Sequence, residues 1–285
     1  MPTVDAHQHF WEIDSGLYDW PTAADGPIYR TFTPSDLAAE LTSVAIDRTV
    51  VVQTVDTLAD TDSMLAAAAA HSFIAGVVGW VPLTDPATTE AALYARRDGA
   101  LCGVRHLIHR EPDPAWLARP DIRPGLALLA ALGMPFDVVA VFPDHLDIVP
   151  DVADAHPDLT LVLDHLAKPP FRAPGWDTWL AQVRRAAERP NVVAKLSGLD
   201  TAAGPGWTTD EIRPAVDAVL RWFGPERLLF GSDWPVCRSV STYAEVVSSM
   251  GELTNALSPT ERAWIMGDTA TRVYGLDRAS RAGDV

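Results

Sequence analysis

Short apolar runs alternate with longer segments of helical character along the whole 285-residue chain. The apolar runs are rich in Val, Leu and Ile, and they cover residues 3–10, 48–54, 73–82, 101–108, 134–141, 160–164, 192–197 and 228–231. The helical segments between them cover residues 34–45, 61–71, 86–97, 122–132, 144–156, 176–188 and 210–223. Thr33-Pro34 and Asp85-Pro86 place a capping residue before proline, a common helix start. Apolar strands that alternate with helices indicate a parallel sheet covered on both faces.

Eight apolar runs favour a closed barrel over an open sheet. Eight is the number of strands that closes a (β/α)8 barrel. An open doubly wound sheet that binds a nucleotide needs a glycine fingerprint, and GxGxxG is absent after the first run. No composition break or low-complexity linker divides the chain. We therefore expect one α/β domain over residues 1–285, a (β/α)8 TIM-type barrel with helices at its C-terminal end.

The charge balance is strongly acidic. Basic side chains number 22 and acidic side chains 38, which gives a formal net charge of −16. This charge argues against a nucleic acid or an anionic membrane as a partner. It excludes no small ligand, because an active site can be locally basic. We therefore expect a small-molecule partner.

Cysteine content and the N-terminus bear on the compartment. Cys102 and Cys237 form no CxxC pair and no disulfide framework. Neither a basic leader nor an apolar stretch of the ~20 residues that a membrane span needs is present. These features predict a cytoplasmic protein.

The first apolar run contains His7-Gln8-His9 near its end. Side chains at i and i+2 of a strand point to one face, so both imidazoles can converge on one ion or substrate. The alternative is a chance HxH in which one histidine has a structural hydrogen bond.

His165 directly follows the sixth run and Asp233 directly follows the eighth. Barrel enzymes keep their catalytic groups at the carboxyl ends of strands. Together with His7 and His9, these residues form a set of three imidazoles and one carboxylate, which suits zinc or another borderline divalent ion. For Asp233 the alternative is a structural cap on the loop that leads to the last helices.

Five motifs in a fixed order carry a resemblance to a known family. They are Val4-Asp5-Ala6-His7-Gln8-His9-Phe10-Trp11, Gly103-Val104-Arg105-His106 with Glu111-Pro112-Asp113, Asp164-His165-Leu166-Ala167-Lys168-Pro169, Lys195-Leu196-Ser197-Gly198-Leu199 and Phe230-Gly231-Ser232-Asp233-Trp234-Pro235. From about Thr3 to Leu276 the chain resembles the amidohydrolase superfamily. Within it, the chain looks like the sugar-lactonase branch of L-fuconolactonases, L-rhamnonolactonases and 2-pyrone-4,6-dicarboxylate lactonases.

The resemblance implies a (β/α)8 barrel that hydrolyses a cyclic ester. It also implies that His7, His9, His165 and Asp233 surround the reacting groups and are the candidate metal ligands. Many members of the superfamily bridge two metals with a lysine at the end of strand 4, but residues 101–109 contain no lysine. The expectation is therefore one divalent ion, zinc or manganese, or catalysis without a metal.

Further residues are candidates for binding a lactone. Asp233 is the expected general base, and His7, His9 and His165 complete the catalytic set. Arg105, His106 and Lys195 could donate to substrate oxygens, and Glu111 could accept from hydroxyls. Trp11 and Trp234 could supply an apolar wall for the ring. For Lys195 and Lys168 the alternative is ordinary ion pairing in the barrel, and for Lys168 this alternative is the favoured interpretation.

Two other functions remain open at this point. A metal-dependent decarboxylase of the same superfamily uses a similar His and Asp set, but it also uses a histidine on strand 7, where this chain has Lys195. A barrel that binds a ligand without turnover is the other alternative. The residues predict no ring size, no individual lactone and no oligomeric state.

Overall fold

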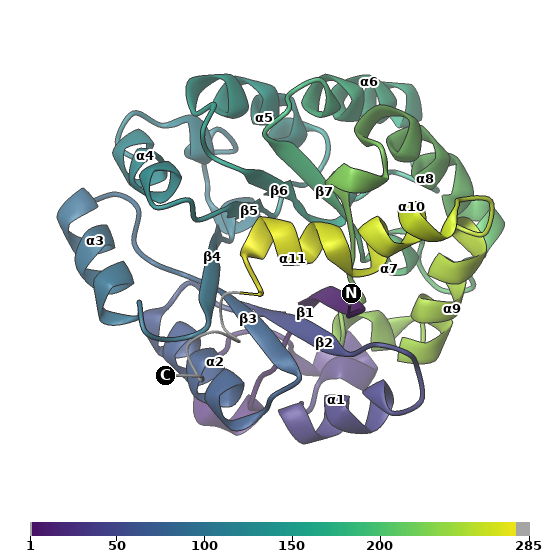
Figure 1. The fold of residues 1–285 in the computed structure, drawn as a ribbon, viewed down its shortest axis with the longest axis horizontal. Helices are drawn as coiled ribbons and strands as arrows, with labels where there is room; N and C mark the ends of the chain where they lie inside the picture. The colour runs from purple at the N-terminus through teal and green to yellow at the C-terminus, as the bar shows by residue number, and fades with distance from the viewer. Residues whose placement is uncertain (1, 278–285) are drawn as a thin grey trace.

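The computed structural model describes residues 2–277, and its core is a barrel of eight parallel strands (Figure 1). Each strand pairs with the next along the chain, from β1 to β8. The strands are β1 (Val4–Gln8), β2 (Arg48–Val52), β3 (Ile74–Gly79), β4 (Leu101–His106), β5 (Phe136–Val138), β6 (Leu161–Leu163), β7 (Val192–Leu196) and β8 (Leu228–Phe230). A parallel bridge between Gln8 and Trp234 joins the end of β1 to the segment after β8. The predicted (β/α)8 barrel is confirmed.

Helices surround the barrel and follow most of the strands (Figure 1). They are α1 (Pro34–Leu41), α2 (Leu58–Ala70), α3 (Pro86–Ala95), α4 (Arg123–Ala131), α5 (Asp144–Ala155), α6 (Trp176–Ala187), α7 (Leu199–Ala203), α8 (Thr209–Phe223), α9 (Tyr243–Leu253), α10 (Pro259–Ala263) and α11 (Thr269–Tyr274). Each predicted helical segment overlaps one of α1–α6 or α8. Thr33 caps α1 in a capping box, and the Asp85 side chain caps α3. The short α7 was not predicted, because its five residues show no amphipathic period.

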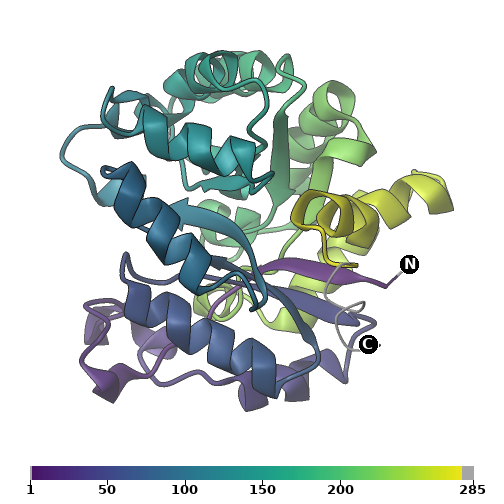
Figure 2. The ribbon, with the colours of Figure 1, turned by 60° about the vertical axis from the view of Figure 1, so that its left-hand side comes forward.

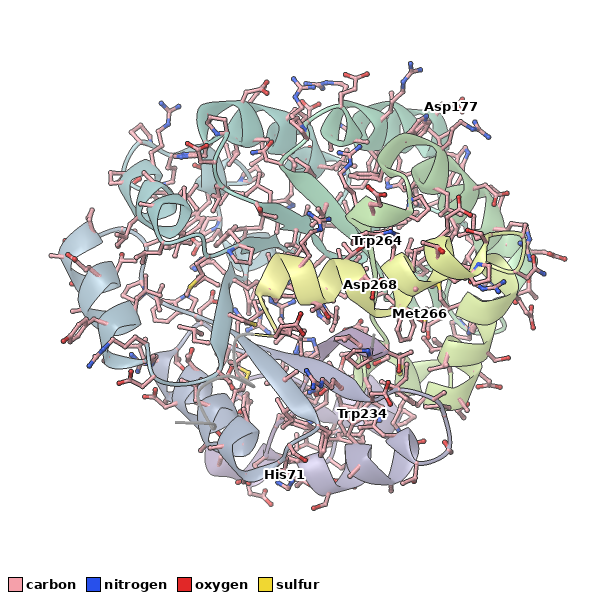
Figure 3. The ribbon with its side chains drawn as sticks, in the orientation of Figure 1. His71, Asp177, Trp234, Trp264, Met266 and Asp268 are labelled. Carbon is pink, nitrogen blue, oxygen red and sulfur yellow. The ribbon has the colours of Figure 1, made fainter. Side chains whose placement is uncertain are left out.

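The C-terminal helices close the end of the barrel where the strands begin. Figures 1 and 2 show α11 lying across that end, close to the start of β1. Ala270 and Tyr274 of α11 join an apolar cluster with strand residues such as Val50 and Val162 inside the barrel. Figure 3 shows Trp264, Met266 and Asp268 along the π-helical segment (Trp264–Asp268) that leads into α11. With this end plugged, the site lies at the opposite end, where the strands finish.

A larger apolar cluster fills the layer between the strands and the outer helices. It includes alternating strand residues such as Val51 and Val104, and inward-facing helix residues such as Leu126 and Val216. His71 ends α2 as its C-cap and lies at the edge of the molecule (Figure 3). Within the described residues, no helix has the length and hydropathy to cross a membrane.

Candidate active site

The buried carboxylate of Asp5 in β1 is hydrogen-bonded to the segment that follows β8. Asp5 accepts hydrogen bonds from the Ser232 backbone N–H at 2.8 Å and from the Ser232 hydroxyl at 2.6 Å. The Tyr243 hydroxyl donates to the same carboxylate at 3.1 Å. Across this seam the Asp233 N–H donates to the carbonyl of His7 at 2.8 Å. The seam therefore holds Asp233 beside the histidines of β1.

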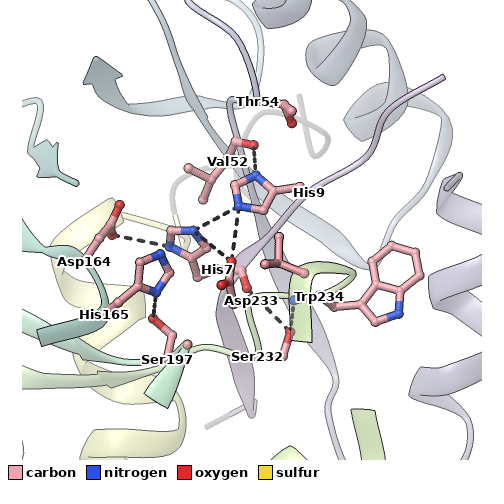
Figure 4. A network of polar contacts seen from close by, with 12 residues as sticks. His7, His9, Val52, Thr54, Asp164, His165, Ser197, Ser232, Asp233 and Trp234 are labelled. Carbon is pink, nitrogen blue, oxygen red and sulfur yellow. Dashed lines mark hydrogen bonds and ion pairs between the residues drawn. The ribbon is translucent and has the colours of Figure 1, made fainter. Parts of the chain in front are cut away.

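The structure brings together the four residues expected from strand ends (Figure 4). Nε2 of His7 lies 3.1 Å from Nε2 of His9. Oδ1 of Asp233 lies 3.7 Å from Nε2 of His7 and 3.4 Å from Nε2 of His9. The ring centre of His165 is 4.5 Å from that of His7. All four side chains are almost wholly buried.

The geometry of this cluster fits a single divalent ion. Ligand atoms at 2.0–2.1 Å from a tetrahedral ion lie roughly 3.3 Å from one another, close to the three separations above. Nδ1 of His9 lies 2.7 Å from the Val52 carbonyl, and Nδ1 of His165 lies 2.9 Å from the Ser197 hydroxyl. When Nδ1 donates, Nε2 keeps the lone pair that a metal needs. His7, His9 and Asp233 thus form one candidate group of ligands.

A second candidate group contains His7, Asp164 and His165. Its carboxylate is already engaged by cations. Oδ1 of Asp164 lies 3.1 Å from Nζ of Lys195, and Oδ2 lies 3.0 Å from Nη1 of Arg105. Because two protein cations neutralise Asp164, the geometry favours one ion at His9 and Asp233 over two ions.

The structure places Lys195 beneath the histidines, outside the cavity. Its side chain is wholly buried, with Nζ 2.5 Å from Oδ2 of Asp137 and 3.1 Å from Nδ1 of His7. The Tyr274 hydroxyl donates to Asp137 at 2.9 Å. Sequence reasoning gave no role to Asp137 or Asp164. Their positions could have indicated a role, because Asp137 lies inside the short apolar strand β5 and Asp164 directly follows the short apolar strand β6.

The turn after β6 has an unusual backbone. His165, Leu166, Ala167 and Lys168 all have positive φ values between 50° and 57°. Left-handed backbone is costly for residues other than glycine and is concentrated at functional sites. Here the turn brings both His165 and Lys168 to the wall of the same cavity.

Burial and neighbouring charges set the protonation of the cluster. Burial and the ammonium of Lys195 lower the pKa of His7 well below its ordinary value, and burial lowers the pKa of His165. Burial alone would raise the pKa of Asp233, but His165, His9 and His7 hold that pKa below its ordinary value. At neutral pH the site therefore contains an ionised Asp233 beside the neutral imidazoles of His7 and His165.

A cavity of about 370 Å³ opens above this cluster. Its volume is in the range of sites for small molecules. It is lined by His9, Trp20, Thr54, Arg105, Leu107, His109, Arg110, Val139, His165, Lys168, Gly198, Thr201, Ala202, Asp233 and Val236. Most of the charged groups are cationic, although the chain as a whole is acidic.

Arg105 lines the cavity, whereas His106 and Glu111 lie beside it. Nε2 of His106 is 2.7 Å from Oε1 of Glu111, and the His106 ring stacks on Trp116 at 3.8 Å. Trp80 donates to Nδ1 of His106 at 3.0 Å. These contacts order the loop after β4, which carries cavity residues.

The structure places Trp11 and Trp234 in the core, and neither lines the cavity. Trp11 donates to the Arg30 carbonyl at 2.7 Å and packs edge-on against Trp20, with ring centres 5.3 Å apart. Trp234 packs edge-on against Phe32. Trp20 is the aromatic side chain in the cavity wall. Sequence reasoning missed it because it lies in a loop, away from any strand end.

Three basic residues of the cavity wall were also not assigned to it from sequence: His109, Arg110 and Lys168. The sequence analysis gave no role to His109 or Arg110. Lys168 was expected to have an ordinary ion pair, but its ammonium has none among residues 2–277, which makes it available to a ligand.

The amidohydrolase family model matches residues 4–276 of this chain. The chain belongs to the amidohydrolase family. It is 38% identical to an L-fucono-1,5-lactonase from Burkholderia ambifaria, over 97% of each chain. The structure of an amidohydrolase from Burkholderia multivorans with bound HEPES is similar at a TM-score of 0.91, with 35% identity over 96% of this chain and 99% of that chain. The structure of an amidohydrolase from the same organism with bound zinc is similar at a TM-score of 0.88, with 34% identity over 96% of this chain and 99% of that chain.

Proposed function

We propose that this protein is a lactonase that opens an aldono-1,5-lactone to its hydroxy acid. The observation that carries the proposal is an ionised, buried Asp233 among three imidazoles at the floor of a cationic cavity. Similarity to an L-fucono-1,5-lactonase over nearly the full length supports the substrate class. The proposed partner is a small molecule, with no nucleic acid or membrane involved, and the cytoplasm is the proposed compartment.

Asp233 is the proposed general base. A base must reach the proton of the attacking water and be in its basic form at working pH. As the water oxygen bonds to the lactone carbonyl carbon, Asp233 takes its proton. The bond between that carbon and the ring oxygen then breaks, and the electron pair goes to the ring oxygen. Asp233 returns the proton to this alkoxide, so that lactone and water become one hydroxy acid.

The proposed ligands of one zinc or manganese ion are some of His7, His9, His165 and Asp233; His7, His9 and Asp233 form one close group, and His165 lies beside His7. Such an ion, when bound, polarises a carbonyl and lowers the pKa of a water.

Arg105 and Lys168 are the proposed donors to substrate oxygens. Both line the cavity: Arg105 can stabilise the negative charge that develops on the carbonyl oxygen, and Lys168 can bind a substrate oxygen away from the reacting carbonyl. Trp20 can cover the C–H face of a sugar ring. In this proposal Lys195, His106, Glu111, Trp11 and Trp234 support these residues from behind.

A lactone screen tests the proposed reaction. Proton release is followed with a pH indicator on 1,5- and 1,4-aldonolactones, a muconolactone and a pyrone lactone, each against a blank without enzyme. We expect the fastest enzymatic opening with a 1,5-aldonolactone. Release of CO₂ from an aromatic or vinylogous acid, without opening of any lactone, would instead establish the decarboxylase.

Metal analysis tests the proposed stoichiometry. The enzyme is purified without chelator or affinity-tag metal and then equilibrated with Zn²⁺ or Mn²⁺. We expect at most one tightly held equivalent per chain, because Arg105 and Lys195 already neutralise Asp164. Two tightly held equivalents would contradict the single-ion site.

A further inference from the structure

A guanidinium lies against the histidine nitrogen that a metal would need. Nη1 of Arg105 is 3.3 Å from Nε2 of His7. This is the same nitrogen that faces His9 at 3.1 Å and Asp233 at 3.7 Å. Arg105 is 3% exposed, so its position is set by the protein and not by solvent.

Nε2 of His7 cannot accept a hydrogen bond from Arg105 and bind a divalent ion at the same time. A guanidinium is only a donor and stays charged, so it engages the lone pair of Nε2. A divalent ion binds histidine through the same lone pair. We propose that Arg105 competes with the divalent ion for Nε2 of His7, and that Arg105 therefore sets the metal affinity of the site.

The surroundings of Arg105 allow it to leave His7 without losing its other contacts. Nη1 is also 3.0 Å from Oδ2 of Asp164, and Nη2 donates to the carbonyl and side-chain oxygens of Gln53. Its Nε is buried and has no hydrogen-bond partner within the described part of the chain. A small shift of the guanidinium can therefore release Nε2 while Asp164 and Gln53 keep hold of it.

Nδ1 of His7 also has two competing partners, the carboxylate of Asp164 and the ammonium of Lys195. Nδ1 lies 3.3 Å from Oδ1 of Asp164 and 3.1 Å from Nζ of Lys195. When Nδ1 donates to Asp164, Nε2 keeps its lone pair; when Nδ1 accepts from Lys195, a neutral ring carries its proton on Nε2. Metal binding thus requires His7 to donate to Asp164, and the contact from Arg105 must also be given up.

Metal affinity of purified protein is the direct test. Zn²⁺ and Mn²⁺ dissociation constants are measured by competition with a chromogenic chelator, without substrate. Arg105→Met should bind each ion at least tenfold more tightly than the wild-type protein. Arg110→Met is the matched control, because Arg110 lines the same cavity but pairs with Asp19 and not with His7. Its dissociation constants should stay within twofold of wild type.

Arg105→Lys separates the hydrogen bond from the charge. It keeps a positive charge next to Asp164, but its shorter side chain does not extend to Nε2 of His7, so it too should bind the ions more tightly than wild type. Wild-type affinity in Arg105→Lys would overturn the proposal, since net charge alone would then set affinity. Unchanged or weaker binding by folded Arg105→Met, with folding checked by thermal unfolding, would also overturn it.

Discussion

Asp233 combines three properties that a general base needs. It is buried, it is surrounded by imidazoles that hold its pKa below the ordinary value, and it lies in the cavity wall. Its backbone is in the left-handed region, with φ of 56°, which is a strained conformation for aspartate. The hydrogen bond from the backbone N–H of Asp233 to the carbonyl of His7 keeps Asp233 in this conformation at the β1–β8 seam.

Asp233→Asn should lower kcat by roughly 10²–10⁴, because it removes the basic oxygen but nearly keeps the shape. Steady-state kinetics on the best lactone, together with thermal unfolding, measures the effect. Asp177→Asn is the control and should behave like wild type, because Asp177 is an exposed carboxylate in α6 that lies at the edge of the molecule (Figure 3) and does not line the cavity. A folded Asp233→Asn variant that keeps more than about a tenth of kcat would reduce Asp233 to a structural cap.

Lys168→Met should raise KM about 10–100-fold with little change in kcat. A hydrogen bond to a charged group contributes about 1.5–3 kcal/mol, and a contact made equally to substrate and transition state appears in KM. Initial rates over a range of lactone concentrations check this. The result would be contradicted by an unchanged KM, which would leave Lys168 as a solvated side chain at the rim.

At the scale of elements, the residues of the site lie at the ends of short strands and in the loops that follow those strands. β1 provides His7, the segment directly after it provides His9, β4 provides Arg105, and the turn after β6 provides His165. The chain segments approach closely at the β1–β8 seam, since a Cβ built at Gly231 would lie 2.7 Å from Cβ of His7 and 3.1 Å from Cβ of Ser197. Only glycine permits this approach.

Gly231→Ala should therefore push His7 away from Asp233. We expect a loss of about 1–3 kcal/mol in the free energy of unfolding, the usual cost of overpacking, and a fall in kcat of tenfold or more. Gly251→Ala is the matched control, because it lies in α9 with no atom within 4 Å of the added Cβ. It should stabilise the protein by about 0.5–1 kcal/mol. Urea unfolding and lactone kinetics on both variants measure these effects. Wild-type kinetics in Gly231→Ala would show that the β1–β8 seam accommodates the added methyl group without moving His7.

At the scale of the whole molecule, buried acids make stability depend on pH. Asp200 of α7 is 3% exposed, and burial raises its pKa to about 6 although the Ser241 hydroxyl donates to it at 2.6 Å. In the unfolded chain its pKa is about 3.9. The folded protein therefore binds the proton more tightly, and stability falls as pH rises between about 4 and 6.

Asp200→Asn removes this ionisation and keeps an oxygen that accepts from Ser241. Relative to the variant, the wild-type protein should lose up to about 3 kcal/mol of unfolding free energy between pH 4 and 7, from a pKa difference of about two units. Urea unfolding of both proteins at several pH values measures this difference. A difference that does not change with pH would mean that Asp200 titrates normally in the folded protein.

The order of apolar runs and the residues at their ends determined the barrel, the amidohydrolase resemblance and the His7, His9, His165 and Asp233 cluster. These are local properties, because a strand's periodicity fixes which residues share a face and parallel strands all end at the same side of a barrel. The sequence alone also predicted Arg105 near the site.

Only the tertiary structure decided which other side chains reach the cavity. Lys195, Trp11 and Trp234 have motif positions like those of cavity residues, but the structure buries them behind it. Trp20 and Lys168 reach the cavity through a loop and a left-handed turn that no period encodes. Loop paths and buried ion pairs such as Lys195 with Asp137 depend on contacts between residues far apart in sequence, and those contacts form only when the barrel closes.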